Sequence, residues 1–272
     1  MVDFHALTER LERIYTPRLA LRQASLADGW PLFAASRNPL FNKHLLWEQP
    51  MDEWPMLDRI DAIVETARRG KLSAVSAVER ETGVWISLFR FLPYGLEPRT
   101  VEMGVWTHHA FWHGTYTFEL VGACIDAVFS FTEVDHLIAA AMPAHERSRR
   151  LLGRLGLTRH GSIVHRPDYN GGVVDVFEHR ITRQEWMQQA ERRRFGVVEP
   201  ATLRAAAAAP IKVGAGISPR GGNAAPAHRP SAEGIVVEPL TLEVDAGRKA
   251  AAQPPQMRPQ PSAQVSADGQ GD

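Results

Sequence analysis

The residues with the clearest chemical potential lie between Val101 and Glu119, in the stretch VEMGVWTHHAFWHGTYTFE. A short apolar strand that carries Glu102 runs into a turn rich in histidine and aromatic residues. Gly114 follows, and then an amphipathic run from Tyr116 to Phe131. A glycine-containing turn that leads into a helix presents backbone N–H groups at the positive end of the helix dipole. The pattern therefore suits a phosphate or pyrophosphate group.

The same stretch holds a group of histidines that invites a metal-site interpretation. His108, His109 and His113 fall within six residues. Their spacing is not that of a zinc-binding helix, and the chain has only one cysteine. The segment His145-Glu146-Arg147-Ser148-Arg149 lacks the second histidine of a metalloprotease motif. We therefore expect no metal.

These residues resemble a known family, the GNAT acyl-CoA N-acyltransferases, and within it the ribosomal-protein (RimJ/RimL-like) N-acetyltransferase branch. Two motifs carry the resemblance, Glu102-Met103-Gly104-Val105-Trp106 and Trp112-His113-Gly114-Thr115-Tyr116-Thr117-Phe118-Glu119-Leu120. It extends upstream to Thr16–Arg22 and downstream through Met142–Ser148 and Arg154–Leu157, and it ends near Trp186. It thus covers roughly the first two-thirds of the chain.

The resemblance implies a binding mode for acetyl-CoA as co-substrate. Strand 101–107 and strand 135–142 would splay apart, acetyl-CoA would lie in the gap, and a backbone N–H near Val105 or Trp106 would stabilise the oxyanion. The remaining cofactor contacts would come from His113, Gly114, Thr115, Tyr116, Thr117 and His145. Thr115 replaces the usual second glycine of the turn, and its Cβ limits how closely the backbone approaches a ligand. His145 replaces the usual asparagine.

Several side chains receive roles from the resemblance, each with a plainer alternative. Glu102 would act as the general base, or it would face solvent or pair with an arginine. Ser148 would protonate the leaving thiolate or bind the pantetheine arm, or it would cap a helix. His145 would contact cofactor or substrate and titrate near neutral pH, or it would be an exposed helix-start residue. Trp47 and Trp54 would contact the acceptor, whereas most of the other aromatics would be core.

Periodicity and turn residues predict an α/β fold with a central mixed, mostly antiparallel sheet flanked by helices. The expected helices span residues 4–14, 25–35, 52–70, 116–131, 144–155 and 183–194. The expected strands span residues 18–23, 72–78, 84–91, 100–106, 135–142, 162–165 and 173–177. We expect a longer loop over 93–98, because it holds two prolines and a glycine, and a break at Asn38-Pro39.

Composition divides the chain into two parts. Residues 1–195 form the expected N-acetyltransferase domain, and 196–272 a disordered tail rich in Pro, Ala and Gly, because no Phe, Tyr or Trp follows Phe195. A net charge of zero at pH 7 argues against nucleic-acid and membrane partners. No apolar stretch reaches the roughly 20 residues that span a bilayer, no signal peptide is recognisable, and the lone Cys124 suits a reducing cytoplasm.

The sequence thus predicts an acetyl-CoA-dependent N-acetyltransferase that acetylates a primary amine, on a protein N-terminus or a small molecule, by direct transfer. The alternative is a catalytically weak or inactive module of the same shape that works through its tail as a protein-interaction component. Monomer and homodimer both remain open.

Overall fold

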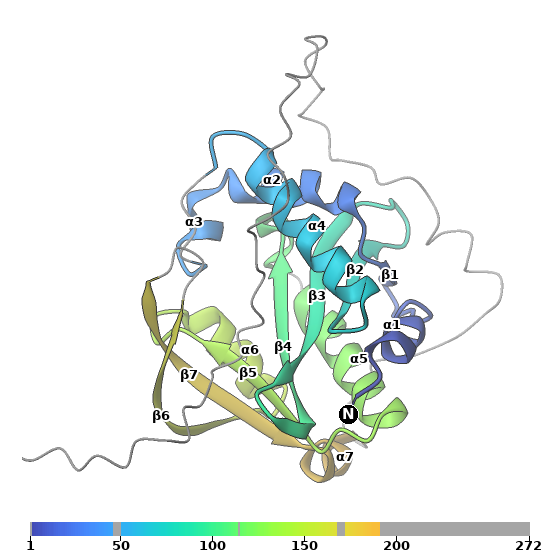
Figure 1. Ribbon diagram of the computed structural model, residues 1–272, viewed down its shortest axis with the longest axis vertical. Coiled ribbons are helices and arrows are strands. Elements are labelled where there is room, and N and C mark those ends of the chain that lie inside the picture. Colours follow the sequence, from blue (N-terminus) through green and yellow to red (C-terminus); the bar gives the residue numbers. More distant parts are fainter. Residues whose placement is uncertain (1, 46–49, 114, 168–171, 191–272) are drawn as a thin grey trace, which may run out of the picture. The chain divides into compact units, whose positions relative to one another are not determined.

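The computed structural model describes residues 2–45, 50–113, 115–167 and 172–190, which build a seven-stranded sheet with helices on both faces (Figure 1). The strand order is β1-β2-β3-β4-β5-β7-β6. Trp47, Gly114 and the expected tail at 196–272 lie outside the described residues.

The helices and strands have the following bounds. The helices are α1 (Phe4–Leu11), α2 (Gly29–Ser36), α3 (Pro39–Asn42), α4 (Trp54–Arg68), α5 (Tyr116–Phe131), α6 (Glu146–Arg154) and α7 (Arg183–Ala190), with short 3-10 turns at Leu26–Asp28 and His109–Phe111. The strands are β1 (Leu19–Gln23), β2 (Ser73–Glu79), β3 (Trp85–Tyr94), β4 (Glu97–Thr107), β5 (His136–Ala141), β6 (Thr158–Pro167) and β7 (Val173–Thr182).

Every neighbouring pair of strands is antiparallel except β4 and β5, which run parallel. This confirms the predicted mixed, mostly antiparallel sheet. The parallel pair is joined by α5, because parallel neighbours need a crossover that returns the chain to the same end of the sheet. The unit β4-α5-β5 therefore sits at the centre of the fold.

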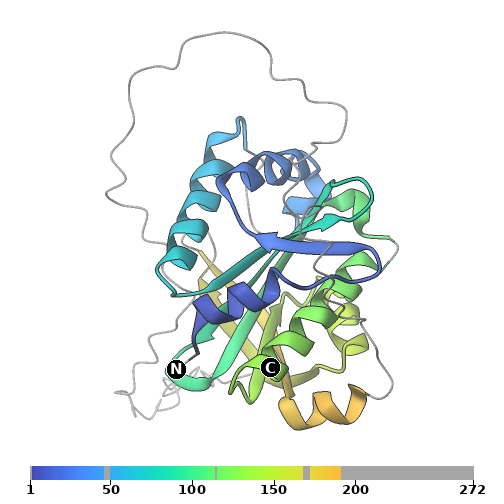
Figure 2. The ribbon, with the colours of Figure 1, turned by 90° about the vertical axis from the view of Figure 1, so that its right-hand side faces the viewer.

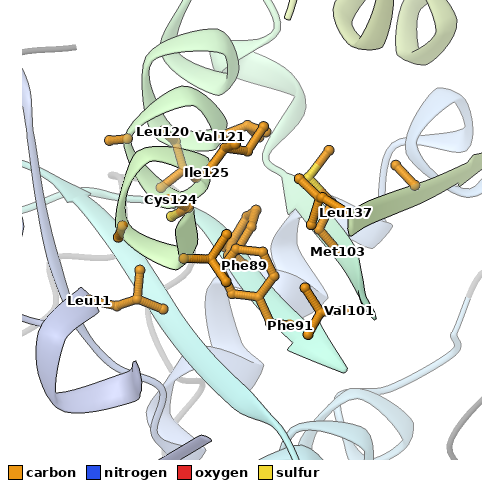
Figure 3. Close-up of a cluster of buried hydrophobic side chains, with 14 of the residues drawn as sticks. Leu11, Phe89, Phe91, Val101, Met103, Leu120, Val121, Cys124, Ile125 and Leu137 are labelled. Atoms are coloured by element: carbon orange, nitrogen blue, oxygen red, sulfur yellow. The ribbon is translucent and has the colours of Figure 1, made fainter. Parts of the chain in front are cut away.

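The larger core lies between the sheet and α5. Figure 3 shows Leu120, Val121, Cys124 and Ile125 of α5 pointing at side chains of the central strands. Those strand residues are Phe89, Phe91, Val101, Met103 and Leu137. Cys124 is fully buried, and burial raises the pKa of its thiol well above the usual value. It is a core residue.

A second core fills the opposite face, where α2 and α4 cover the sheet (Figure 2). Met56, Ile60 and Ile63 of α4 pack there with Trp85 and Trp106 from the strands. Along β4, odd-numbered residues such as Val101 and Met103 face α5, and Trp106 faces α4. This alternation puts Glu102 on the α4 face, because side chains change face at each strand residue.

Some predicted boundaries were wrong. The expected loop over 93–98 is a tight hairpin in which Tyr94 pairs with Glu97 and Gly95 takes a positive φ of 53°. Pro93 is the penultimate residue of β3, and a shift in register follows it. The expected break at Asn38-Pro39 is confirmed, because α2 ends at Ser36, but a further short helix, α3, begins there, where the Asn38 side chain accepts from Leu40 N at 2.9 Å. Both β6 and β7 are longer than expected.

Candidate active site

The site begins where β4 and β5 separate. Their parallel pairing runs only from Thr100↔His136 to Glu102↔Ile138. Beyond that point β4 stays paired with β3 up to Thr107, while β5 stays paired with β7 up to Ala141. Figure 1 shows the two strands diverging. The expected splay is thus confirmed. Beyond Glu102, this edge of β4 faces the gap between β4 (103–107) and β5 (139–141), which is called the opening below.

Backbone alternation identifies which N–H groups line this opening. His108 N donates to Ile86 O of β3 at 2.9 Å, so even-numbered residues at this end of β4 direct their backbone groups at β3. Odd-numbered residues face the other way, and Thr107 O accordingly accepts from the indole of Trp112 at 2.9 Å. The N–H of Val105 therefore points to the opening, whereas that of Trp106 points to β3. Of the two expected donors, only Val105 has the required orientation.

The turn before α5 adopts the conformation that usually needs glycine. Thr115 has φ 66° and ψ 10°, and it is the N-cap of α5 without a side-chain capping bond. The next residues are tied to neighbouring strands: Tyr116 donates to Glu79 Oε1 at 2.7 Å, and Thr117 donates to Thr107 Oγ1 at 3.1 Å. His113 is exposed. These two hydrogen bonds tie the first turn of α5 to β2 and β4.

Arg18 was not among the predicted site residues, yet it reaches this turn. Its Nη2 donates to Thr115 Oγ1 at 3.0 Å, and its Cζ lies 4.0 Å from the centroid of the Tyr116 ring. Its Nε donates to Glu119 Oε2 at 2.7 Å, in the first turn of α5. An arginine here places a cation near the helix end that favours anions. Nearly one hundred residues separate the partners, so no local pattern signals the contact.

His145 sits at the start of α6 and meets an unexpected partner. Its ring stacks on that of His44, which follows α3, with centroids 4.3 Å apart and planes 14° apart. Burial, followed by the charges of His44 and Arg147, lowers the pKa of His145 to about 4. The expectation that it titrates near neutral pH was wrong, because the ring is desolvated. His145 is neutral at pH 7.

Ser148 lies in the first turn of α6. The N-cap of α6 is His145, so Ser148 is the third helical residue. It therefore does not cap the helix, and the plainer alternative considered for it was wrong. Its hydroxyl belongs to the first turn of α6, where N–H groups lack partners within the helix. The roles predicted for Ser148 at the thiolate or the pantetheine arm stay predictions.

Glu102 is buried and held by an arginine from a distant strand. Nη1 of Arg166 lies 2.7 and 2.8 Å from its two carboxylate oxygens, and the Glu102 side chain is 12% exposed. Burial raises the pKa of Glu102 above the ordinary value, and Arg166 is the main opposing influence. A raised pKa favours a general base, whereas the arginine contact is the structural role considered beside it. The catalytic role of Glu102 stays a prediction.

Two tryptophans frame the remaining surface. Trp54 is the first residue of α4 and is 62% exposed, which leaves its ring available for contact. Trp112 carries the guanidinium of Arg147 over its ring at 4.4 Å. Arg147 therefore lies beside the turn that precedes α5. Among the described residues, no group of three or more His, Cys, Asp or Glu could hold a metal ion.

An open strand edge beside a helix N-terminus is the arrangement expected of an acyl-CoA-dependent transferase. A family model described as an acetyltransferase (GNAT) domain matches residues 18–158. The chain belongs to this family of N-acetyltransferases. A comparison with curated proteins gave no match. In the part of the chain that the structure describes, no helix is long and apolar enough to cross a membrane.

Solved structures share the fold at low sequence identity. A GNAT-family acetyltransferase from Bacillus anthracis matches with a TM-score of 0.53 and 18% identity over 63% of this chain and 99% of that one. A putative ribosomal-protein-serine acetyltransferase from Vibrio cholerae gives 0.55 and 18% over 62% and 96%. A microcin self-immunity acetyltransferase in complex with acetyl-CoA and AMP gives 0.53 and 13% over 61% and 93%.

Proposed function

We propose that this protein transfers the acetyl group of acetyl-CoA to the primary amine of an acceptor by direct attack within a ternary complex. The observation that carries the proposal is the separation of β4 from β5 after Glu102↔Ile138, which leaves the N–H of Val105 facing the opening. A fixed backbone donor aimed at a developing oxyanion is among the larger contributions to acyl-transfer catalysis.

Acetyl-CoA would supply the activated acetyl group. Its phosphates would be held at the N-terminus of α5 by backbone N–H groups of the 113–117 turn, where Gly114 lies outside the described residues. Arg147, stacked on Trp112, is close enough to this turn to add a positive charge. Ser148 and the neutral ring of His145, both in or next to the first turn of α6, would contact the pantetheine arm.

Glu102 would accept the proton that the acceptor ammonium loses, directly or through water. Glu102 and Val105 are three residues apart on β4, a rise of roughly 10 Å, so a water-mediated route fits the spacing better than direct contact with the reacting carbon. Ser148 would donate a proton to the departing thiolate. These assignments rest on the placement of the side chains and on the resemblance of the motifs.

The acceptor is proposed to be a protein N-terminus or a small amine. The exposed ring of Trp54 at the start of α4 offers an apolar contact on the acceptor side, together with Trp47 from outside the described residues. One of the structures with this fold is described as a putative ribosomal-protein-serine acetyltransferase, which supports testing protein N-termini first. We propose membership of that ribosomal-protein branch on the same motifs.

The test is an acceptor screen with the full-length chain, scored by mass spectrometry of the products. Peptides with different N-terminal residues and a panel of small primary amines would be offered with acetyl-CoA. With any accepted substrate, Glu102→Gln is expected to lower kcat by about 10²-fold, the low end for general-base removal, while acetyl-CoA binding persists.

Glu97→Gln is the matched control, because Glu97 lies on the same strand but away from the opening and pairs with Arg180. Its kcat should match that of the unmodified protein. Unchanged turnover in Glu102→Gln would remove Glu102 from the mechanism. Absence of product with every acceptor would count against the proposed function itself.

A further inference from the structure

A chain of four polar side chains crosses the α4 face of the sheet beside Glu102. Nη1 of Arg166 contacts both oxygens of Glu102 at 2.7 and 2.8 Å, and its Nη2 donates to Glu178. The hydroxyl of Tyr94 then donates to the two oxygens of Glu178 at 3.1 and 3.0 Å. These residues come from four strands: β3, β4, β6 and β7.

The path of the Arg166 side chain is what sets this cluster apart. Its strand, β6, is the edge of the sheet and is separated from β4 by β7 and β5 (Figure 1). The pairing of β7 with β5 ends at Phe177. Arg166 pairs with Val174, three residues before Phe177 in the chain, in the part of β7 that β5 no longer pairs with. Its guanidinium therefore bridges the two arms of the sheet at the point where β4 and β5 separate.

The ion pair between Arg166 and Glu178 in this cluster is also shielded from water. The side chains of Arg166 and Glu178 are 5% and 8% exposed. Removing such charges from water costs several kcal/mol per ion, and well-packed apolar residues would often stabilise the same position equally well. A purely structural account leaves unexplained why these charges converge on Glu102.

We infer that Arg166, anchored by Glu178 and Tyr94, is a positioning residue that fixes the carboxylate of Glu102 at the base of the opening. This inference rests on the proposed function, in which Glu102 accepts the acceptor's proton. Arg166 needs no contact with the substrate for this role. It holds the base in place and sets the charge around it.

The electrostatics give the inference a signed consequence. Three charged groups face Glu102, each from a different strand: Arg166 from β6, Arg90 from β3 and Glu178 from β7. Burial raises the pKa of Glu102; Arg166 and then Arg90 lower it, and Glu178 raises it. Removing the charge of Arg166 must therefore raise the pKa of Glu102, and removing the charge of Glu178 must lower it.

The opposite signs separate positioning from simple structural support. Loss of a packing contact would weaken the fold in both variants and would give no reason for the pKa of Glu102 to move in two directions. Glu178→Gln preserves the shape of the side chain and keeps an oxygen that accepts from Arg166 and Tyr94. It therefore changes charge with little change in packing.

The experiment is a carboxyl-carbon NMR titration of the full-length chain labelled at the glutamate side chains, with Glu102→Gln used to assign the Glu102 signal. In Arg166→Met, the pKa of Glu102 is expected to rise by about one unit or more, the usual effect of losing a close opposite charge. In Glu178→Gln it should fall. Arg166→Lys, which keeps the charge at a single point, should lie between the unmodified protein and Arg166→Met.

This titration needs no acceptor, so its outcome is separate from the fate of the proposed function. If Arg166→Met does not fold, Arg166→Lys and Glu178→Gln still test the predicted rise and the predicted fall in the pKa of Glu102. A Glu102 pKa that stays constant, or moves in one direction in all variants, overturns the inference. Once an acceptor is known, the apparent pKa of the acid limb of the kcat/KM profile must shift in the same direction as the pKa of Glu102 in each variant. An acid limb that stays unchanged in these variants also overturns the inference.

Discussion

The left-handed conformation of Thr115 offers the sharpest test of how the turn before α5 is built. Among the described residues it is the one non-glycine position with positive φ, at 66°. A Cβ in this region crowds the following carbonyl and costs about 1–2 kcal/mol, and branching at Cβ makes the conformation rarer still. Against this, the Thr115 hydroxyl accepts a hydrogen bond from Arg18 at 3.0 Å, which contributes about 1 kcal/mol.

Two substitutions separate the strain from the hydrogen bond. Thr115→Ala loses the hydrogen bond and keeps the Cβ, so it should destabilise the protein by about 1 kcal/mol. Thr115→Gly also loses the hydrogen bond but relieves the strain, while glycine adds about 0.4–1 kcal/mol of unfolded-state entropy. The glycine variant should therefore match the unmodified protein closely and exceed the alanine variant by about 1 kcal/mol.

The assay is urea unfolding of the full-length chain and of both variants, with thermal unfolding as a second measure. A difference of 1 kcal/mol corresponds to about 2–4 °C for a domain of this size. Saturating acetyl-CoA should raise the melting temperature of Thr115→Gly by more than that of Thr115→Ala, because the turn backbone then approaches the phosphates without a Cβ between them. If the alanine variant equals or exceeds the glycine variant in stability, the strain argument fails.

Two further predictions concern the ends of the helices. Because the pKa of His145 is about 4 in the folded protein and near the ordinary 6.5 when unfolded, the unfolded state binds more protons between these values, and stability should fall as the pH drops through that window. His145→Asn should reduce this loss of stability, measured as the difference in melting temperature between pH 7 and pH 5. His160→Asn, at an exposed position, is the control and should leave the difference unchanged. If both variants lose the same stability between these pH values, burial of the His145 ring is not the cause. Arg183 donates to the carbonyls of Phe129, Thr132 and Val134 at the end of α5. Arg183→Met should therefore lower the free energy of unfolding in urea by about 2 kcal/mol. The loss should be clearly larger than in Arg99→Met, because the exposed Arg99 pairs with Asp135 and donates to only one carbonyl, that of Glu133. Equal losses in the two variants would mean that water satisfies the carbonyls that Arg183 leaves.

The sequence predicted the elements whose signals are local. The helix expected over 116–131 matches α5 (Tyr116–Phe131), because its apolar spacing and preceding turn act within one segment. The buried strand expected at 135–142 matches β5 (His136–Ala141) within one residue at each end. The β3–β4 connection was predicted too long because its prolines suggested a loop, although Pro93 is accommodated beside a register shift and Gly95 supplies the positive φ of a tight hairpin.

The site was predictable only in part, for the same reason. Glu102 and Val105, the proposed base and oxyanion donor, were predicted from a motif that lies on one strand. Arg166 and Glu178 were not, because their contact with Glu102 depends on β6 and β7 folding back beside the opening. His44 likewise reaches His145 from about one hundred residues away. Contacts of this kind are fixed by strand order and packing, and no spacing rule in the sequence expresses them.

The arrangement of the strands predicts that two parts of the candidate site differ in their tolerance to substitution. At the two helix starts proposed to contact the cofactor, Thr115 and His145 each meet a residue distant in sequence, Arg18 and His44 respectively. Glu102, the proposed base, instead belongs to a set of charges in which the side chains of Arg166 and Glu178 are only 5% and 8% exposed. A substitution of Arg166 or Glu178 leaves a buried charge without its partner, whereas a substitution at the exposed Thr115 meets water. Single substitutions of Arg166 or Glu178 should therefore cost more stability than single substitutions of Thr115.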